Sequence, residues 1–303
     1  MWWLAIPSWA GDLDLRLTAV DFDLSADTER SVERILTRMH DTDESWLGVV
    51  LPPVLPIQVD LVASEAAYRA REAEAGAKGG HTVGFFLPAR SLAVVWRGQG
   101  DLEMRRTLVH EISHYLLVAG GLGGVPLYLQ EGLAELFETA TLDGNAVWLV
   151  PDPATVGWVQ GRPLAASALI GRSKADWDAA ANTPWGRAEY PYGWALCSFL
   201  LSTDPGRHTL SDLLASTAVS RDPGADGLAA VERTYPGGAV ALDRDWRAWI
   251  ASPRRIQLPV SAGGGQAAGW VKCSDGRLIR PDAGYTCGRW VTGADGLQHY
   301  VED

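Results

Sequence analysis

The chain has 303 residues, of which 47% are hydrophobic and 21% are charged, as is ordinary for a globular protein of one large domain or two modest ones. Its net charge of −11 argues against nucleic acid as a partner, because no basic patch is present to neutralise phosphates. Pro52, Pro53 and Pro56 interrupt the longest apolar run, so the sequence predicts no membrane span.

The first hundred residues are predicted to form a small mixed α+β layer. Residues 12–24 alternate apolar and polar positions, which is typical of a half-buried strand. A periodic helix over about 28–40 follows, with Ser25 or Asp27 as its cap. PIQVDLVAS predicts a second strand, and a polar, alanine-rich helix follows it near residues 65–75. HTVGFFLP and SLAVVW predict two further strands or hairpin arms.

The chain is then predicted to be mostly helical up to residue 252. Asp101 is expected to cap a helix that stops at Gly120 and Gly121. A glycine-rich connection leads into a second helix, LYLQEGLAELFETA, and a hairpin at DGNAVWLVPDP precedes several more helices. One of these, ALCSFLL, carries Cys197, which we expect to be a buried packing residue.

The C-terminal residues differ in composition from the rest. SAGGGQAAG has the composition of a flexible linker, and the residues beyond it alternate short β-like pieces with turns. We therefore divide the chain into a main domain over 1–252, a linker over 253–269 and a small β-rich tail over 270–303.

Two of the three cysteines lie in this tail. Cys273 and Cys287 flank a turn-rich segment, and a disulfide between them would close a loop of 15 residues. Such a bond contributes about 3 kcal/mol in the chain-entropy model, which is useful to a tail with little core of its own. A disulfide favours an oxidising compartment, so we expect a secreted or periplasmic protein. Two free thiols are the alternative.

The segment TLVHEISHYLL, residues 107–117, carries the motif on which the functional prediction depends. His110 and His114 are four residues apart, so on a helix they lie on one face, where two imidazoles can bind one metal ion. Glu111, directly after the first histidine, can reach a nearby water molecule. A chance combination of three polar residues on an amphipathic helix is the alternative.

The next helix offers a third ligand. A catalytic zinc site uses three protein ligands and keeps one position open. QEGLAELFE places Glu131 and Glu135 four residues apart, and the glycine-rich turn lets this helix fold back toward the histidines. Glu131 could then bind the metal, and Glu135 could accept a hydrogen bond from a ligand imidazole. The alternative is two solvated glutamates on a surface helix.

HEISH followed by QEGLAE resembles the gluzincin metallopeptidases, and more closely the compact bacterial peptidase-MA-like proteins, in which an HExxH helix precedes a W-x-x-EGxAE helix. Tyr128 stands where tryptophan is usual, and the similarity covers residues 12–252. It implies an α+β, gluzincin-like fold. This fold has a small mixed N-terminal sheet with helices, a helical C-terminal half and a zinc cleft between them.

The resemblance also implies roles for individual residues. His110, His114 and Glu131 would be the zinc ligands, and Glu135 would support a ligand imidazole. Glu111 would be the general base that takes a proton from the attacking water and later protonates the leaving amine.

A tyrosine is expected to assist the developing oxyanion. EYPYGWALCSFLL resembles an aminopeptidase N segment in which a tyrosine three residues before a glycine has this role. Tyr190 has this spacing to Gly193, and Tyr192 is the second choice. Aromatic packing at a helix start is the alternative for both tyrosines. His208, expected in a polar loop, is a weaker candidate.

The strand before the motif helix is expected to bind substrate. In gluzincins a strand in this position forms the edge of the cleft and pairs with extended peptide. Gly84 and Phe85 in HTVGFF could do so here, or could belong to a core strand. The G-x-M-E-N signature of aminopeptidases does not occur in the chain, which argues for an endopeptidase.

The sequence therefore predicts a zinc-dependent peptidase that hydrolyses peptide or protein substrates and uses zinc as its cofactor. One alternative is an inactive zinc-stabilised scaffold, against which Glu111 argues because a structural metal site needs no base. Another is a binding protein that uses Trp270 and Trp290 of the tail. Serine hydrolase chemistry is not expected, since no G-x-S-x-G elbow occurs.

Overall fold

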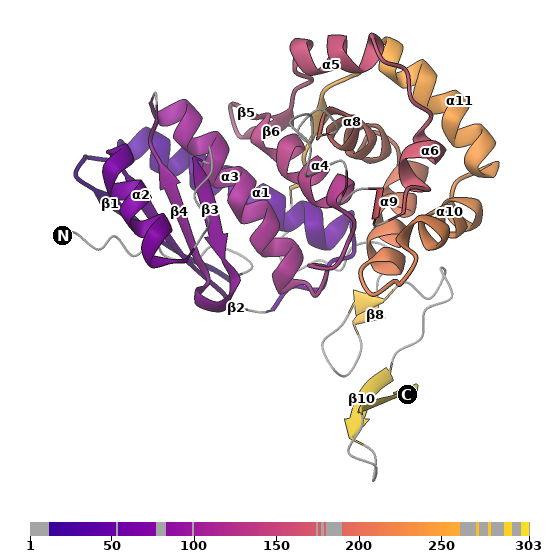
Figure 1. Cartoon of the computed structure of the whole chain (residues 1–303), viewed down its shortest axis with the longest axis horizontal. Helices are drawn as coiled ribbons and strands as arrows, with labels where there is room; N and C mark the ends of the chain where they lie inside the picture. Colours follow the sequence, from indigo (N-terminus) through magenta and orange to yellow (C-terminus); the bar gives the residue numbers. More distant parts are fainter. Residues whose placement is uncertain are drawn as a thin grey trace.

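The structure is a computed structural model, and its fold is mixed α+β (Figure 1). A small sheet with helices forms the N-terminal half, and helices dominate the C-terminal half, as predicted. None of the helices described is long and apolar enough to cross a membrane. The structure describes residues 12–52, 54–76, 83–98, 100–173, 175–176, 179 and 190–260, and four short strands between 271 and 302.

The N-terminal half is built on a four-stranded sheet in the order β1-β2-β4-β3. The first three strands in this order are parallel, and β3 runs antiparallel to β4 at one edge. Helices α1 and α3 pack on one face of the sheet and α2 packs on the other. The elements are β1 (Asp12–Val20), α1 (Ala26–Ser45), β2 (Val54–Val62), α2 (Glu65–Glu74), β3 (Gly84–Leu87), the short 3₁₀ helix η1 (Pro88–Arg90), β4 (Leu92–Trp96) and α3 (Asp101–Ala119).

The C-terminal half packs its helices around α8, whose residues from 192 to 201 are all buried. A continuous apolar core joins this half to the face of the sheet that carries α1 and α3. The elements are α4 (Leu127–Glu138), β5 (Ala140–Asp143), β6 (Ala146–Leu149), α5 (Pro153–Gln160), α6 (Ala166–Ile170), α8 (Tyr190–Leu201), α9 (Asp204–Thr217), α10 (Pro223–Thr234), α11 (Gly238–Ala251) and β7 (Ile256–Gln257).

Helices α4 and α8 approach each other at backbone distance through two glycines. A Cβ atom on Gly132 would lie 2.5 Å from the carbonyl carbon and oxygen of Gly193. A Cβ atom on Gly193 would lie 2.5 Å from the carbonyl oxygen of Tyr128. Any larger residue at either position would push the helices apart. Cys197 of α8 is buried in this region, as predicted.

The caps of α1 and α3 were predicted from the sequence, and one of the two predictions is wrong. Ser25 caps α1 by accepting a hydrogen bond from the backbone N–H of Thr28 at 3.1 Å, as expected. The prediction that Asp101 caps the motif helix is wrong, because Gly100 is the N-cap and its φ of 142° is one that favours glycine. The Asp101 carboxylate instead accepts hydrogen bonds from Arg97 at 2.8 Å and from the Thr28 hydroxyl at 3.2 Å. The helix ends at Gly120, as predicted.

The predicted hairpin is present as β5 and β6, and β7 adds a third strand that the sequence did not predict. The chain from 253 to Leu258 is therefore attached to the main domain and is not part of a flexible linker as predicted, because β7 pairs with β6 and the side chains of Ile256 and Leu258 are buried. Residues 261–269 and the two tail cysteines lie outside the described residues. The tail contains the short strands β8 (Val271–Lys272), β9 (Leu278–Ile279), β10 (Gly288–Thr292) and β11 (Gln298–Glu302), in two antiparallel pairs.

Candidate metal centre

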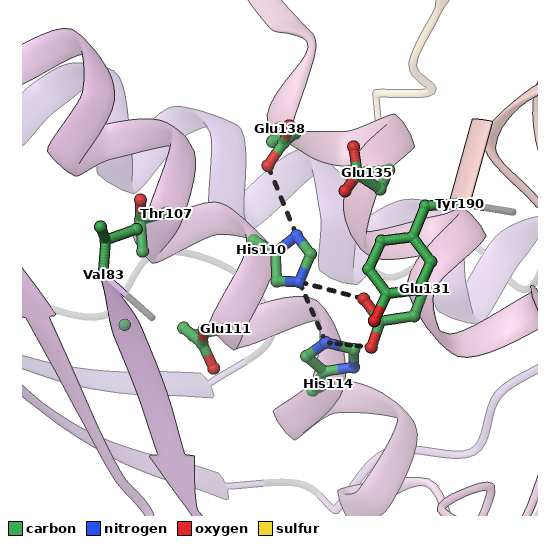
Figure 2. Close-up of a pocket in the computed structure, with 10 residues that line it drawn as sticks. Val83, Thr107, His110, Glu111, His114, Glu131, Glu135, Glu138 and Tyr190 are labelled. Atoms are coloured by element: carbon green, nitrogen blue, oxygen red, sulfur yellow. Dashed lines mark hydrogen bonds and ion pairs between the residues drawn. The ribbon is translucent and has the colours of Figure 1, made fainter. Parts of the chain in front are cut away.

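Two histidines of α3 and one glutamate of α4 converge on one point, as predicted. The Nε2 atoms of His110 and His114 lie 3.2 Å apart. The Glu131 carboxylate lies 3.4 Å from Nε2 of His110 and 3.8 Å from Nε2 of His114. One donor atom from each residue lies within 4.8 Å of the others (Figure 2). The three side chains could therefore hold one metal ion.

The connection between α3 and α4 is fixed by local hydrogen bonds. The backbone N–H of Leu122 donates to the carbonyl of Leu117 at 2.7 Å, which closes the end of α3. The Gln130 side chain donates to the carbonyl of Val125 at 2.6 Å, which ties the start of α4 to the turn before it. Because Gln130 precedes Glu131, this bond also limits the freedom of the backbone that carries the third candidate ligand.

The residues that carry these donor atoms line a cavity of about 420 Å³. Figure 2 shows the imidazoles in its middle, with Glu111 toward β3 and Tyr190 on the opposite side. Its charged side chains are four carboxylates and the two histidines, with no lysine or arginine among the described lining residues. Such a lining suits a bound cation. The lining residues are Val83, Gly84, Thr107, His110, Glu111, His114, Glu131, Glu135, Glu138 and Tyr190.

The two imidazoles differ in their protonation in the metal-free protein. Burial alone would lower the pKa of His110, but its contacts with Glu131 and Glu138, and the charge of Glu111, raise it to about 10. Burial lowers the pKa of His114 to about 4, because the attraction of Glu131 only partly offsets it. One imidazole is therefore charged near neutral pH and the other is neutral. The positive charge on His110 offsets part of the negative charge of the surrounding carboxylates.

Burial also raises the pKa of two glutamates in the cavity. The pKa of Glu111 rises to about 7 through burial, although the charge of His110 opposes this shift. The pKa of Glu135 also rises to about 7, through burial and the nearby charge of Glu138. In the metal-free protein Glu111 can therefore gain or lose a proton close to neutrality.

Glu138 contacts His110 in the position that the sequence assigned to Glu135. One Glu138 carboxylate oxygen lies 3.4 Å from Nδ1 of His110, so the ring faces Glu138 on one edge and Glu131 on the other (Figure 2). Glu135 lines the same cavity and forms a hydrogen bond with Glu138. Sequence reasoning missed Glu138, although residues four and seven positions after Glu131 share one helix face.

The structure separates the candidates for the oxyanion donor. Tyr190 lines the metal cavity at the start of α8. The Tyr192 hydroxyl donates to the carbonyl of Arg162 at 2.5 Å, and its ring packs edge-on against Trp158, away from the cavity. His208 lies within α9 and not in the predicted loop, and it is not among the residues that line the cavity.

Gly84 and Phe85, the two residues predicted to bind substrate, face opposite sides of the sheet because side chains alternate along β3. Gly84 faces the cavity, where a Cβ atom would lie 2.5 Å from Cγ2 of Thr107 and 3.0 Å from a carboxylate oxygen of Glu111. Phe85 points to the other face of the sheet, where its ring packs against Tyr68 of α2 at 5.7 Å. The Phe85 side chain therefore faces away from the cavity, whereas its backbone belongs to the edge strand beside the cavity, and pairing of this strand with a peptide stays a prediction.

No protein-family model matches this chain, and no curated protein sequence matches it either. The case for a function therefore depends on the chemistry of the cavity itself. Two imidazole nitrogens and one carboxylate are a donor set that zinc favours, and three protein ligands leave one position open.

Proposed function

We propose that this protein is a zinc-dependent peptidase of gluzincin type that cleaves internal bonds of peptide or protein substrates. The observation that carries the proposal is the convergence of His110, His114 and Glu131 beside Glu111 in one cavity. A metal site that served only to join two helices would need no carboxylate in the place of Glu111. The edge strand β3 beside the cavity also supports a substrate in extended conformation.

The ligands fit zinc as a catalytic ion. Both histidines present Nε2 to the site, and the Nδ1 edge of His110 faces the Glu138 carboxylate. Contacts of this kind fix the tautomer and the orientation of a ligand imidazole. Zinc, when bound, supplies a Lewis acid that polarises a peptide carbonyl and lowers the pKa of water toward 7.

Glu111 is the proposed general base. Its carboxylate accepts a proton from the water that attacks the peptide carbonyl, and then passes this proton to the nitrogen of the leaving amine. The C–N bond breaks as the amine leaves, so one water is consumed for each bond cleaved. The carboxylate lies against Gly84 of β3, and this position places it between the metal ligands and the strand that would hold the substrate.

Tyr190 is the proposed donor to the oxyanion that develops on the substrate carbonyl. Its place in the cavity, opposite Glu111, supports this role (Figure 2). A single donor of this kind contributes on the order of 10²–10³ in rate in other acyl-transfer enzymes. Tyr190→Phe would therefore lower kcat by about this factor and leave the metal in place.

Peptide-library cleavage tests the proposed function, with amino-terminally blocked peptides included to separate internal from terminal cleavage. The zinc-loaded wild type should cleave blocked peptides, and Glu111→Gln should lose at least a hundredfold in kcat while it retains zinc. Zinc binding without cleavage of any peptide would favour the scaffold alternative. Cleavage of unblocked peptides alone would contradict the assignment as an endopeptidase.

A further inference from the structure

A second cavity lies at the opposite end of α8 from the metal centre. Helix α8 begins with Tyr190 in the metal cavity, and its 12 residues span about 18 Å at about 1.5 Å per residue. The second cavity measures about 550 Å³, within the range of small-molecule sites, about 300–1,000 Å³. Its lining residues are Trp46, Ser202, Thr203, Arg207, Ala248, Trp249, Ser252, Arg254, Arg255, Ile256 and Gln257.

This cavity is cationic, although the chain as a whole carries a charge of −11. Its charged lining residues are Arg207, Arg254 and Arg255, and no carboxylate side chain is among the described residues that line it. Arg207 forms an ion pair with Asp204 at 2.8 Å, but the Asp204 side chain is 91% exposed, so water screens this pair. Arg254 and Arg255 form no ion pair within the described part of the chain. The lining therefore has an excess of positive charge.

Stacking on tryptophans holds two of the three guanidinium groups. The Arg207 guanidinium lies 3.8 Å from the ring centroid of Trp46, and its Nε donates to the carbonyl of Leu201 at 2.9 Å. The Arg255 guanidinium lies 4.1 Å from the ring centroid of Trp148, which belongs to β6, the strand that pairs with β7. A guanidinium held by its face loses less freedom when its N–H groups bind a ligand.

We propose that this cavity binds a small organic anion through a phosphate or carboxylate group. Guanidinium groups pair with both oxyanions in a two-pronged geometry, and the arginines supply the donors. The rings of Trp46 and Trp249 offer apolar walls for the body of the ligand. The proposal does not depend on the metal centre.

The test measures the binding of phenyl phosphate, benzoate and inorganic phosphate to the full-length protein by ligand-observed NMR titration. Wild type should bind phenyl phosphate or benzoate saturably. The probe with the lower Kd shows whether the cavity prefers a phosphate or a carboxylate group. Weaker binding of inorganic phosphate than of phenyl phosphate would support a role for the aromatic walls. The double variant Arg254→Gln/Arg255→Gln should bind at least tenfold more weakly.

Two control variants locate the binding. Arg221→Gln removes an exposed arginine that does not line the cavity, and it should bind as wild type does. Glu131→Ala removes a metal ligand, and it should also retain binding, whereas anions that bind at the metal would be lost. Equal binding by the double variant and wild type would overturn the proposal. So would the absence of saturable binding of all three probes by wild type.

Discussion

Three carboxylates on one face of α4 make different contacts at the proposed metal site. Glu131 faces both imidazoles, Glu138 contacts the Nδ1 edge of His110, and Glu135 bonds to Glu138 between them. The spacing of four and seven residues places all three on one side of the helix. At the scale of single residues, the structure therefore predicts different effects for each of these glutamates.

Replacing Glu138 should weaken metal binding without removing a ligand. Glu138→Leu should lower the affinity for zinc by about 10–100-fold, because His110 would lose the partner that orients its ring. Glu138→Gln should restore part of this loss, since an amide oxygen can still accept from Nδ1. Competition with a chromophoric chelator measures the affinity. Glu135→Leu is the matched control, and a larger loss in this variant than in Glu138→Leu would contradict the assignment.

Metal binding should also release a proton near neutral pH. The pKa of His110 is about 10 in the metal-free protein, whereas a ligand imidazole must be neutral. Below pH 10, binding must remove this proton, so affinity should rise about tenfold per pH unit between about pH 7.5 and 9. The pKa of His114 is about 4, so this residue should release none in that range. Calorimetry in buffers of different ionisation enthalpy counts the protons, and a value near zero at pH 8 would contradict this account.

The contact between α4 and α8 positions the site at the scale of whole elements. Gly132 follows the proposed ligand Glu131, and its partner Gly193 lies three residues after Tyr190. The close approach of the two glycines therefore brings the proposed oxyanion donor to the same cavity as the third ligand. This explains why both helices carry glycine in positions where other residues would favour a helix.

Gly193→Ala should destabilise the protein by about 1–3 kcal/mol, the usual cost of overpacking. The added methyl group would lie 2.5 Å from the Tyr128 carbonyl oxygen, and α8 would have to move away from α4. Urea unfolding measures the change. Gly157→Ala in exposed α5, where a Cβ atom meets nothing within 4 Å, should instead stabilise by about 0.5–1 kcal/mol. Equal effects of the two substitutions would show that the close contact is absent.

For the molecule as a whole, the sequence predicted the parts of the site that depend on local spacing. His110 and His114 are four residues apart on one helix, so their shared face follows from helix geometry alone. The glycine-rich turn and the helical pattern after it also placed Glu131 correctly. These features need no knowledge of how distant elements pack.

Features that depend on packing between distant elements could not be predicted. The packing of α8 against α4 and α5 determines that Tyr190 lines the cavity and that the Tyr192 ring contacts Trp158 instead. The sequence also does not show which side of β3 meets α3, so it could not predict that Gly84 faces the cavity and the Phe85 side chain faces α2. The arginine-lined cavity joins residues from Trp46 to Gln257, and no local pattern connects them.

The two halves share one apolar core, so metal binding between α3 and α4 should stabilise the whole molecule. A ligand that binds only the folded state adds about 2.7 kcal/mol when its free concentration is a hundred times its Kd. Thermal unfolding should therefore shift to higher temperature as zinc is added, in one cooperative transition.

The metal content of the purified wild type, measured beside that of Glu131→Ala, shows whether His110, His114 and Glu131 bind zinc; both proteins are first dialysed against the same zinc buffer. We expect about one zinc per chain in wild type and a large loss in Glu131→Ala, with both proteins folded by circular dichroism. Wild type without zinc, or equal zinc in the two proteins, would contradict it.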